Sequence, residues 1–184
     1  MDEVTKLMVE QLRDAYSAEK QALRGMQKMM RNATSEKLKQ GFEMHIEQTE
    51  TQIERVEQAL ERLGSKPGRK VCEAMRGLIE EANHEMGDHD KGPMMDVVII
   101  AAAQRVEHYE IAAYGTMVAL AKAAGQQELA DLLAQTLSEE KMTDEKLTQV
   151  AESEVNPAFI REARSEEQEG ANENRRGGAR RKAS

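Results

Sequence analysis

The stretch AAAQRVEHYEIAAYGTMVALA, residues 101–121, places an acidic residue, Glu110, on the apolar side of a helix. An α-helix turns by about 100° per residue, so side chains three or four positions apart share a face. The apolar face here consists of Ala103, Val106, Ala113, Met117 and Ala121. A carboxylate buried on that face without a partner costs several kcal/mol. A single acidic residue of this kind often lies at the edge of the apolar face and reaches solvent. It indicates a buried site only if other acidic residues lie at the same level of the fold.

The rest of the chain predicts further amphipathic helices. Of its 184 residues, 33% are charged, 3% are aromatic and 3 are proline, a composition that suits long helices better than a sheet. Apolar residues recur at helical spacing in five segments, over residues 4–31, 36–63, 71–86, 94–124 and 126–151. We predict an all-α fold: a ferritin-like up-down four-helix bundle of two helical hairpins, with the short helix in the crossover between them.

The apolar pattern fades after Asn156 and Pro157. We therefore predict one bundle domain over residues 1–156 and a disordered polar tail over 157–184. The end of this tail is basic, with Arg175, Arg176, Arg180, Arg181 and Lys182.

Three more acidic residues lie in apolar stripes. They are Glu19 in the first long helix, and Glu140 and Asp144, one turn apart, in the last. The second long helix carries His45 in its stripe. Residues equally distant from the turn of an antiparallel hairpin lie at one level, so Glu19 faces the region of His45, and Glu110 faces Glu140. Four converging carboxylates repel one another unless cations neutralise them.

This layer predicts a site for two metal ions, iron or manganese, because carboxylates and imidazole suit both and carboxylates can bridge two ions. Two choices stay open. Glu50, at the edge of the second stripe, is an alternative ligand to His45, and Tyr16 either packs in the core or donates a hydrogen bond to a ligand carboxylate. The predicted ligands are Glu19, His45, Glu107, Glu110, Glu140 and Asp144.

Five segments of the chain resemble the bacterial YciF/YciE-like proteins, a ferritin-like family linked to stress responses. They are AYSAEKQALRGM (15–26), HIEQTETQIERVEQ (45–58), CEAMRGLIEEAN (72–83), AAAQRVEHYEIAAYGT (101–116) and LSEEKMTDEKL (137–147). The resemblance implies an up-down bundle, a homodimer and a dinuclear metal site. The wider ferritin pattern has Glu-x-x-His on each of two helices, whereas this chain has Thr49-x-x-Gln52 and Glu140-x-x-Thr143. The predicted centre is therefore poor in histidine.

The function we expect is stress protection by a di-metal protein that oxidises Fe(II) with peroxide or dioxygen, or that removes peroxide. One alternative is a non-enzymatic structural or partner-binding bundle. Another is a DNA-protective protein that contacts nucleic acid weakly through the basic tail. The net charge of −8 argues against a general nucleic-acid binder.

Other features narrow the setting. A single cysteine, Cys72, excludes an intramolecular disulfide, and we read it as a buried apolar side chain in a cytoplasmic protein. No apolar run approaches the length of a membrane span, so no membrane partner is expected. The sequence NHEMGDHD, residues 83–90, is read as a solvated loop rather than a surface metal site.

Overall fold

Five α-helices make up nearly all of the described chain. The computed structural model describes residues 1–165, 167 and 168, and these residues contain no strand. In chain order the helices are α1 (Glu3–Asn32), α2 (Glu36–Arg62), α3 (Glu73–Gly87), α4 (Pro93–Ala123) and α5 (Gln127–Val150), followed by a short π-helical turn, η1 (Ala151–Val155). The predicted all-α class is confirmed.

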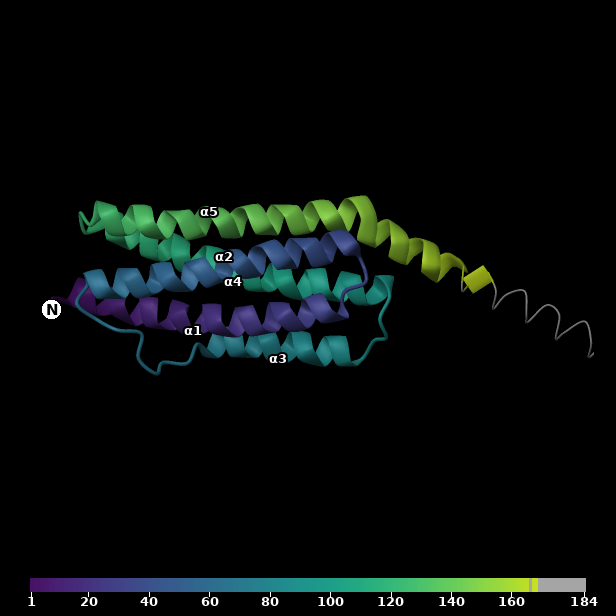
Figure 1. Ribbon diagram of the computed structural model, residues 1–184, viewed down its shortest axis with the longest axis horizontal. Coiled ribbons are helices and arrows are strands. Elements are labelled where there is room, and N and C mark those ends of the chain that lie inside the picture. Colours follow the sequence, from purple (N-terminus) through teal and green to yellow (C-terminus); the bar gives the residue numbers. More distant parts are fainter. Residues whose placement is uncertain (166, 169–184) are drawn as a thin grey trace, which may run out of the picture.

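The four long helices form two antiparallel hairpins that lie side by side (Figure 1). Helix α1 packs on α2 and α4, and α5 packs on α2 and α4, so the four helices surround a common core. The crossover segment carries α3, which packs against α1 and α4 on the outside of the bundle. This arrangement is the predicted ferritin-like bundle of two hairpins, with its short helix in the predicted place.

Local signals in the sequence fix where these helices begin and end. The N-cap of α1 is Asp2, whose side chain accepts a hydrogen bond from the Thr5 backbone at 2.8 Å. The N-cap of α2 is Ser35. At the end of α4, Gly125 has a φ of 71°, and the backbone N–H of Gln126 donates to Ala121. Glycine adopts this left-handed conformation without steric cost, so the chain can turn directly into α5.

The turn between α1 and α2 is held by a carboxylate from another helix. Asp96, in the first turn of α4, accepts hydrogen bonds from the backbone N–H of Thr34 at 2.7 Å and of Ser35 at 2.8 Å. Its second oxygen also accepts from the Thr34 hydroxyl at 2.6 Å. These bonds tie the first hairpin to the start of the second.

The core is divided into two apolar clusters with a polar layer between them. The cluster near the α1–α2 turn includes Ala22, Phe42 and Val106, and the opposite cluster includes Ala15 and Leu133. Along each long helix, buried polar residues lie between the residues of the two clusters: Glu19 in α1, His45, Thr49 and Gln52 in α2, Glu107 and Glu110 in α4, and Thr136, Glu140 and Thr143 in α5. The single layer predicted from the sequence is therefore present.

The helical path continues beyond the predicted end of the bundle. In η1 the backbone N–H of Asn156 donates to Ala151, one residue further back than in an α-helix. This wider turn directly precedes Pro157, which has no N–H to donate. Residues 156–165 are then helical, so the prediction that disorder begins at residue 157 is wrong for this stretch. The basic end of the tail lies outside the described residues.

Helix α2 also holds the chain at η1. Glu154 accepts a hydrogen bond from the Ser35 hydroxyl at 2.5 Å and lies 3.2 Å from the Lys37 ammonium. Within the described part of the chain, no helix combines the length and the apolar character needed to cross a membrane.

Candidate metal centre

Five ionisable side chains from the four long helices meet in the polar layer. Helix α1 supplies Glu19, α2 supplies His45, α4 supplies Glu107 and Glu110, and α5 supplies Glu140. Each of the five residues is at most 3% exposed. The structure thus brings together five of the six residues predicted as ligands.

The imidazole of His45 faces the carboxylates with one nitrogen. Its Nε2 lies 3.3 Å from Glu107 Oε1 and 3.4 Å from Glu140 Oε2. One donor atom from each of these three residues lies within 4.8 Å of the other two. The other nitrogen, Nδ1, lies 3.3 Å from Gln48 Oε1 and 3.2 Å from Thr143 Oγ1. Histidines that bind metals are oriented in this way, with one ring nitrogen on the metal side and the other held by a hydrogen bond.

Most oxygens of this layer have no hydrogen-bond partner in the structure. The buried oxygens without a partner among the described residues are Glu19 Oε2, Gln52 Oε1, Glu107 Oε2, Glu110 Oε1 and both oxygens of Glu140. Buried polar atoms are almost always paired in proteins, because an unpaired one loses its hydration without compensation. This concentration of free oxygens fits a site for cations.

The pKa values of the carboxyl groups reflect this crowding. Burial, and then the nearby Glu140 carboxylate, raise the pKa of Glu19 to about 8. Burial likewise raises the pKa of Glu107 to about 8, although His45 acts in the opposite direction. Burial and the neighbouring carboxylates of Glu19, Glu140 and Glu107 also raise the pKa of Glu110 well above its usual value. Glu140 acts on all three, which places its carboxylate centrally.

Two forces oppose each other at His45. Burial alone lowers the pKa of the imidazole, but the adjacent carboxylates of Glu107 and Glu140 outweigh burial and raise the pKa well above its usual value. In the metal-free chain, the layer therefore keeps protons that isolated side chains would release.

A tyrosine supports the carboxylate of α1. The hydroxyl of Tyr114 donates to Glu19 Oε1 at 2.5 Å, and both side chains are buried. The sequence pattern places Tyr114 on the inner face of α4 but gives no sign of its bond to a residue 95 positions away. The alternative candidate, Tyr16, makes no hydrogen bond to a carboxylate of the layer within the described part of the chain, and its hydroxyl accepts from Lys20 at 3.4 Å.

The structure places Asp144 outside the layer. It is only half-buried, and its Oδ1 lies 3.1 Å from Gln104 Nε2 and 3.4 Å from His108 Nε2. The buried position belongs to Thr143 instead. The expectation that Asp144 points inward with Glu140 is wrong, because the buried face of α5 runs through Thr136, Glu140 and Thr143 and leaves Asp144 at its edge.

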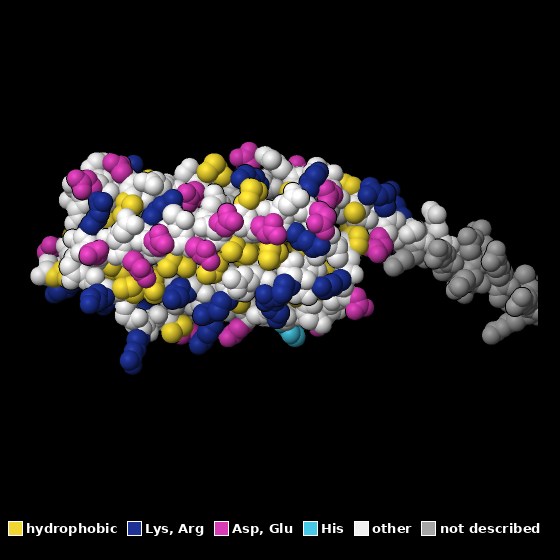
Figure 2. Space-filling model, viewed as in Figure 1, with side chains coloured by type: hydrophobic (Ala, Val, Ile, Leu, Met, Phe, Trp, Pro, Cys, Tyr) yellow, Lys and Arg dark blue, Asp and Glu magenta, His cyan; other side chains and the backbone are white. Residues whose placement is uncertain are grey.

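Glu50, the alternative to His45 on α2, also lies outside the layer. Glu50 is exposed and belongs to a stripe of glutamates on the outer face of α2, namely Glu43, Glu47, Glu50, Glu54, Glu57 and Glu61. Figure 2 shows acidic side chains following α2 across this face of the molecule. His45 is therefore the ionisable side chain that α2 contributes to the layer.

Two polar groups of α2 border the layer on the side of α5. Gln52, at the position of the histidine in the wider ferritin pattern, donates to Glu139 Oε2 at 3.0 Å. Arg55 holds both oxygens of Glu139, at 2.5 and 2.8 Å. Its guanidinium hydrogen bonds lower the pKa of Glu139 despite partial burial. Arg55 and Glu139 are thus paired with each other, whereas the glutamates of the layer keep oxygens without a partner among the described residues.

The remaining candidates show no comparable arrangement. His84 is exposed and lies 4.0 Å from Asp88, which agrees with a solvated segment. Cys72 is buried as predicted, and its Sγ lies 2.9 Å from the hydroxyl of Tyr109. Tyr109 in turn donates to Asp14 at 2.7 Å.

Comparison with known proteins agrees with this architecture. The chain is 47% identical to the protein YciF of Escherichia coli (strain K12) over 157 residues, which covers 85% of this chain and 95% of that protein. The solved structure of that stress protein superposes with a TM-score of 0.78 over 85% of this chain and 99% of its own. YcfI of Rhodopseudomonas palustris, for which a structural role has been suggested, is 41% identical, with a TM-score of 0.78 over 82% of this chain and 96% of its own.

A more distant likeness concerns the fold alone. A ferritin-like diiron-carboxylate protein of Bacillus anthracis str. Ames superposes with a TM-score of 0.65 at 16% identity, over 82% of this chain and 99% of its own.

Residues 3–159 match the family described as a domain of unknown function, DUF892. The chain therefore belongs to this YciF-like family, DUF892.

Proposed function

We propose that this protein binds two iron or manganese ions in the polar layer and uses them against peroxide or dioxygen. The observation that carries the proposal is the set of buried oxygens without partners on Glu19, Glu107, Glu110 and Glu140. Four ionised carboxylates and two divalent cations balance in charge, and oxygen and imidazole donors suit both metals. Glu140, whose carboxylate acts on the other three, would hold the ions together with them.

The chain's own residues would prepare this centre. His45 presents Nε2 to the layer while Gln48 and Thr143 hold Nδ1. Tyr114 fixes the carboxylate of Glu19. When bound, two ferrous ions supply one electron each, so that hydrogen peroxide takes up two electrons and two protons and leaves as two waters. The two apolar clusters on either side keep bulk water from the layer.

The first experiment measures metal content in matched variants. Purified protein is loaded anaerobically with Fe(II) or Mn(II), desalted and analysed by mass spectrometry for metal per chain. We expect about two ions per wild-type chain, and loss of most of this metal in Glu140→Gln and Glu19→Gln, because each removes a charged donor. Asp144→Asn is the control, since Asp144 lies outside the layer, and it should keep the wild-type metal content.

Metal binding must also stabilise the fold. Metal at 100 times its dissociation constant adds about 2.7 kcal/mol to the free energy of unfolding, which calorimetry detects as a higher Tm. The Tm of Glu140→Gln should not respond to metal. A wild-type chain with no stoichiometric metal, or variants that bind as well as wild type, would defeat the proposal.

A peroxide pulse separates a reactive centre from a metal that only stabilises the bundle. If the ferrous protein oxidises at the rate of free Fe(II) in the same buffer, the metal only stabilises the bundle. The protein would then be structural, the role suggested for YcfI of Rhodopseudomonas palustris. Faster oxidation that consumes about one peroxide for two Fe(II) supports the reactive centre, since each peroxide accepts two electrons.

A further inference from the structure

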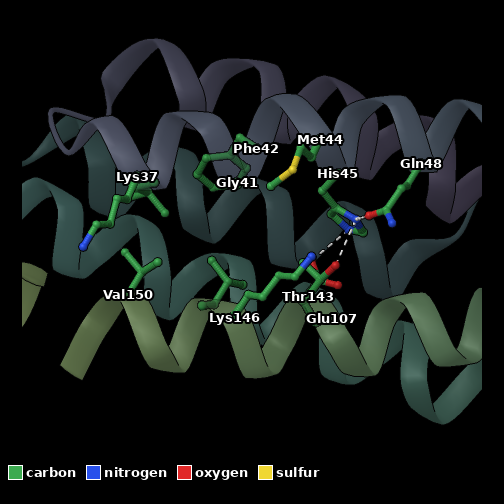
Figure 3. A pocket seen from close by; sticks show the side chains of 12 residues that line it. Lys37, Gly41, Phe42, Met44, His45, Gln48, Glu107, Thr143, Lys146 and Val150 are labelled. Atoms are coloured by element: carbon green, nitrogen blue, oxygen red, sulfur yellow. Dashed lines mark hydrogen bonds and ion pairs between the residues drawn. The ribbon is translucent and has the colours of Figure 1, made fainter. Parts of the chain in front are cut away.

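A narrow cavity leads from the surface to the polar layer between α2 and α5. It has a volume of about 40 Å³ and ends at His45, Glu107 and Thr143. In Figure 3 the residues of α2 lie along one side of the cavity and those of α5 along the other. A volume of this size holds roughly three water-sized molecules, so an organic substrate does not fit.

The walls of this cavity are mostly apolar. They are formed by Leu38, Phe42, Met44, Leu147 and Val150, together with the backbone at Gly41. The polar side chains are gathered at the inner end, around His45, and at the outside, where Lys37 and Lys146 are exposed. A hydrated cation would lose its water along such walls.

We infer that this cavity is the entry route by which a small uncharged oxidant, dioxygen or hydrogen peroxide, reaches the layer at His45 and Glu107. The inference rests on the proposed function for its chemistry, because the metal site defines what such a molecule meets. It adds the side of entry and the residues that line it.

Gly41 offers a clean way to block the route. A Cβ added at Gly41 meets no atom within 4 Å, so Gly41→Leu places its side chain in the cavity without a clash on the backbone. Gly77→Leu is the matched control, because Gly77 is also inside a helix, has no atom within 4 Å of an added Cβ and is exposed. Both changes replace a helical glycine with leucine and gain similarly in helix propensity.

The first measurement needs no metal. Dissolved oxygen under pressure relaxes methyl NMR signals near the places it visits. In the metal-free wild type and in Gly77→Leu, we expect strong relaxation at the methyl groups of Leu38, Leu147 and Val150. Gly41→Leu should lose it. Leu12, in the opposite apolar cluster, is the internal reference.

The second measurement uses the iron-loaded protein in a stopped-flow experiment, once with dioxygen and once with peroxide. Gly41→Leu should bind as much iron as Gly77→Leu but oxidise it about tenfold more slowly, because a filled core opens only by fluctuation. Slowing with one oxidant alone identifies the molecule that uses the route.

Equal rates in Gly41→Leu and Gly77→Leu with both oxidants overturn the entry route while leaving the metal centre intact. If the wild type binds no metal, the proposed function fails, and the NMR comparison alone decides about access. Unchanged oxygen relaxation in Gly41→Leu then overturns the inference.

Discussion

Two sets of buried carboxylates in this bundle differ in how they are compensated. Asp96, at the end of the bundle, is 3% exposed, and both of its oxygens accept hydrogen bonds from Thr34 and Ser35. The glutamates of the polar layer are equally buried, yet five of their oxygens have no partner among the described residues. A carboxylate that serves the fold alone is satisfied by the fold, as Asp96 is.

The difference shows which buried carboxylates still have oxygens that can bind a ligand. The carboxylate of Asp96 needs no further ligand, because the backbone N–H groups of Thr34 and Ser35 already donate to its oxygens. The layer is completed only by something from outside the chain. We therefore expect that a change at Asp96 lowers stability without affecting what the layer binds.

The largest expected effect is a pH dependence that only the layer produces. Glu19 and Glu107 have pKa values of about 8 in the folded chain, against the ordinary value of 4.5 in the unfolded chain. Between these two pH values, the folded state therefore binds more protons than the unfolded state. Their contribution to stability is complete below pH 4.5 and is lost as pH rises towards 8. Each group contributes up to about 1.4 kcal/mol per pH unit.

The raised pKa values of Glu110 and His45 act in the same direction. For His45, the stability is complete below 6.5 and is lost as pH rises through the folded pKa. We therefore expect the free energy of unfolding of the metal-free protein to fall by several kcal/mol from pH 5 to pH 8. Denaturant titrations in chelator-treated buffer measure this decline.

The Glu107→Gln variant should flatten this profile, because it removes one of the groups with a raised pKa. Mn(II) should bind more tightly as pH rises, since binding releases protons from the ligands. A wild-type profile that is flat in the absence of metal would contradict the picture of an uncompensated layer.

The next effect concerns the satisfied carboxylate. Asp96→Ala leaves the backbone N–H groups of Thr34 and Ser35 without their acceptor, so we expect a loss of about 3 kcal/mol of stability. In a chain of this size, this loss corresponds to roughly 10 °C in Tm by calorimetry. Metal content per chain should stay at the wild-type value. Asp88→Ala, at an exposed aspartate, is the control with little expected change. Loss of metal in a folded Asp96→Ala protein would break the division between the two sets.

The smallest effect tests a residue that belongs to both functions. Tyr114→Phe removes the hydroxyl that donates to Glu19 and should cost about 1 kcal/mol of stability. It should also weaken metal binding by about tenfold, because a group that orients a ligand is lost. Metal titrations followed by Tm give both numbers. If affinity is unchanged, Tyr114 serves packing alone.

The layer could be predicted because its residues interrupt otherwise apolar stripes. Glu19, His45, Glu110 and Glu140 are visible in the sequence for this reason, and hairpin symmetry gives their common level. The error at Asp144 has a geometric source. Positions 143 and 144 both lie about one helical turn from Glu140, so helical spacing alone fits either of them. The rotation of α5 against its neighbours decides between them and buries Thr143.

Other parts could not be predicted from local pattern. The partners of Asp96 lie 61 and 62 residues earlier in the chain, and no spacing rule connects them. The helix over residues 156–165 has Pro157 as its second residue, which in the sequence suggests the start of a tail. This helix continues from α5 through the wider turn of η1, and no local pattern in the sequence predicts that turn.

The contacts at Ser35 also set an order for folding during synthesis. Ser35 caps α2 through Leu38, three residues away, so this bond forms as soon as the first hairpin emerges from the ribosome. Its bonds to Asp96 and Glu154 span 61 and 119 residues and must wait for the later helices. A nascent chain that has not reached residue 154 can therefore hold a capped first hairpin, but the end of the bundle closes only when the last helix is complete.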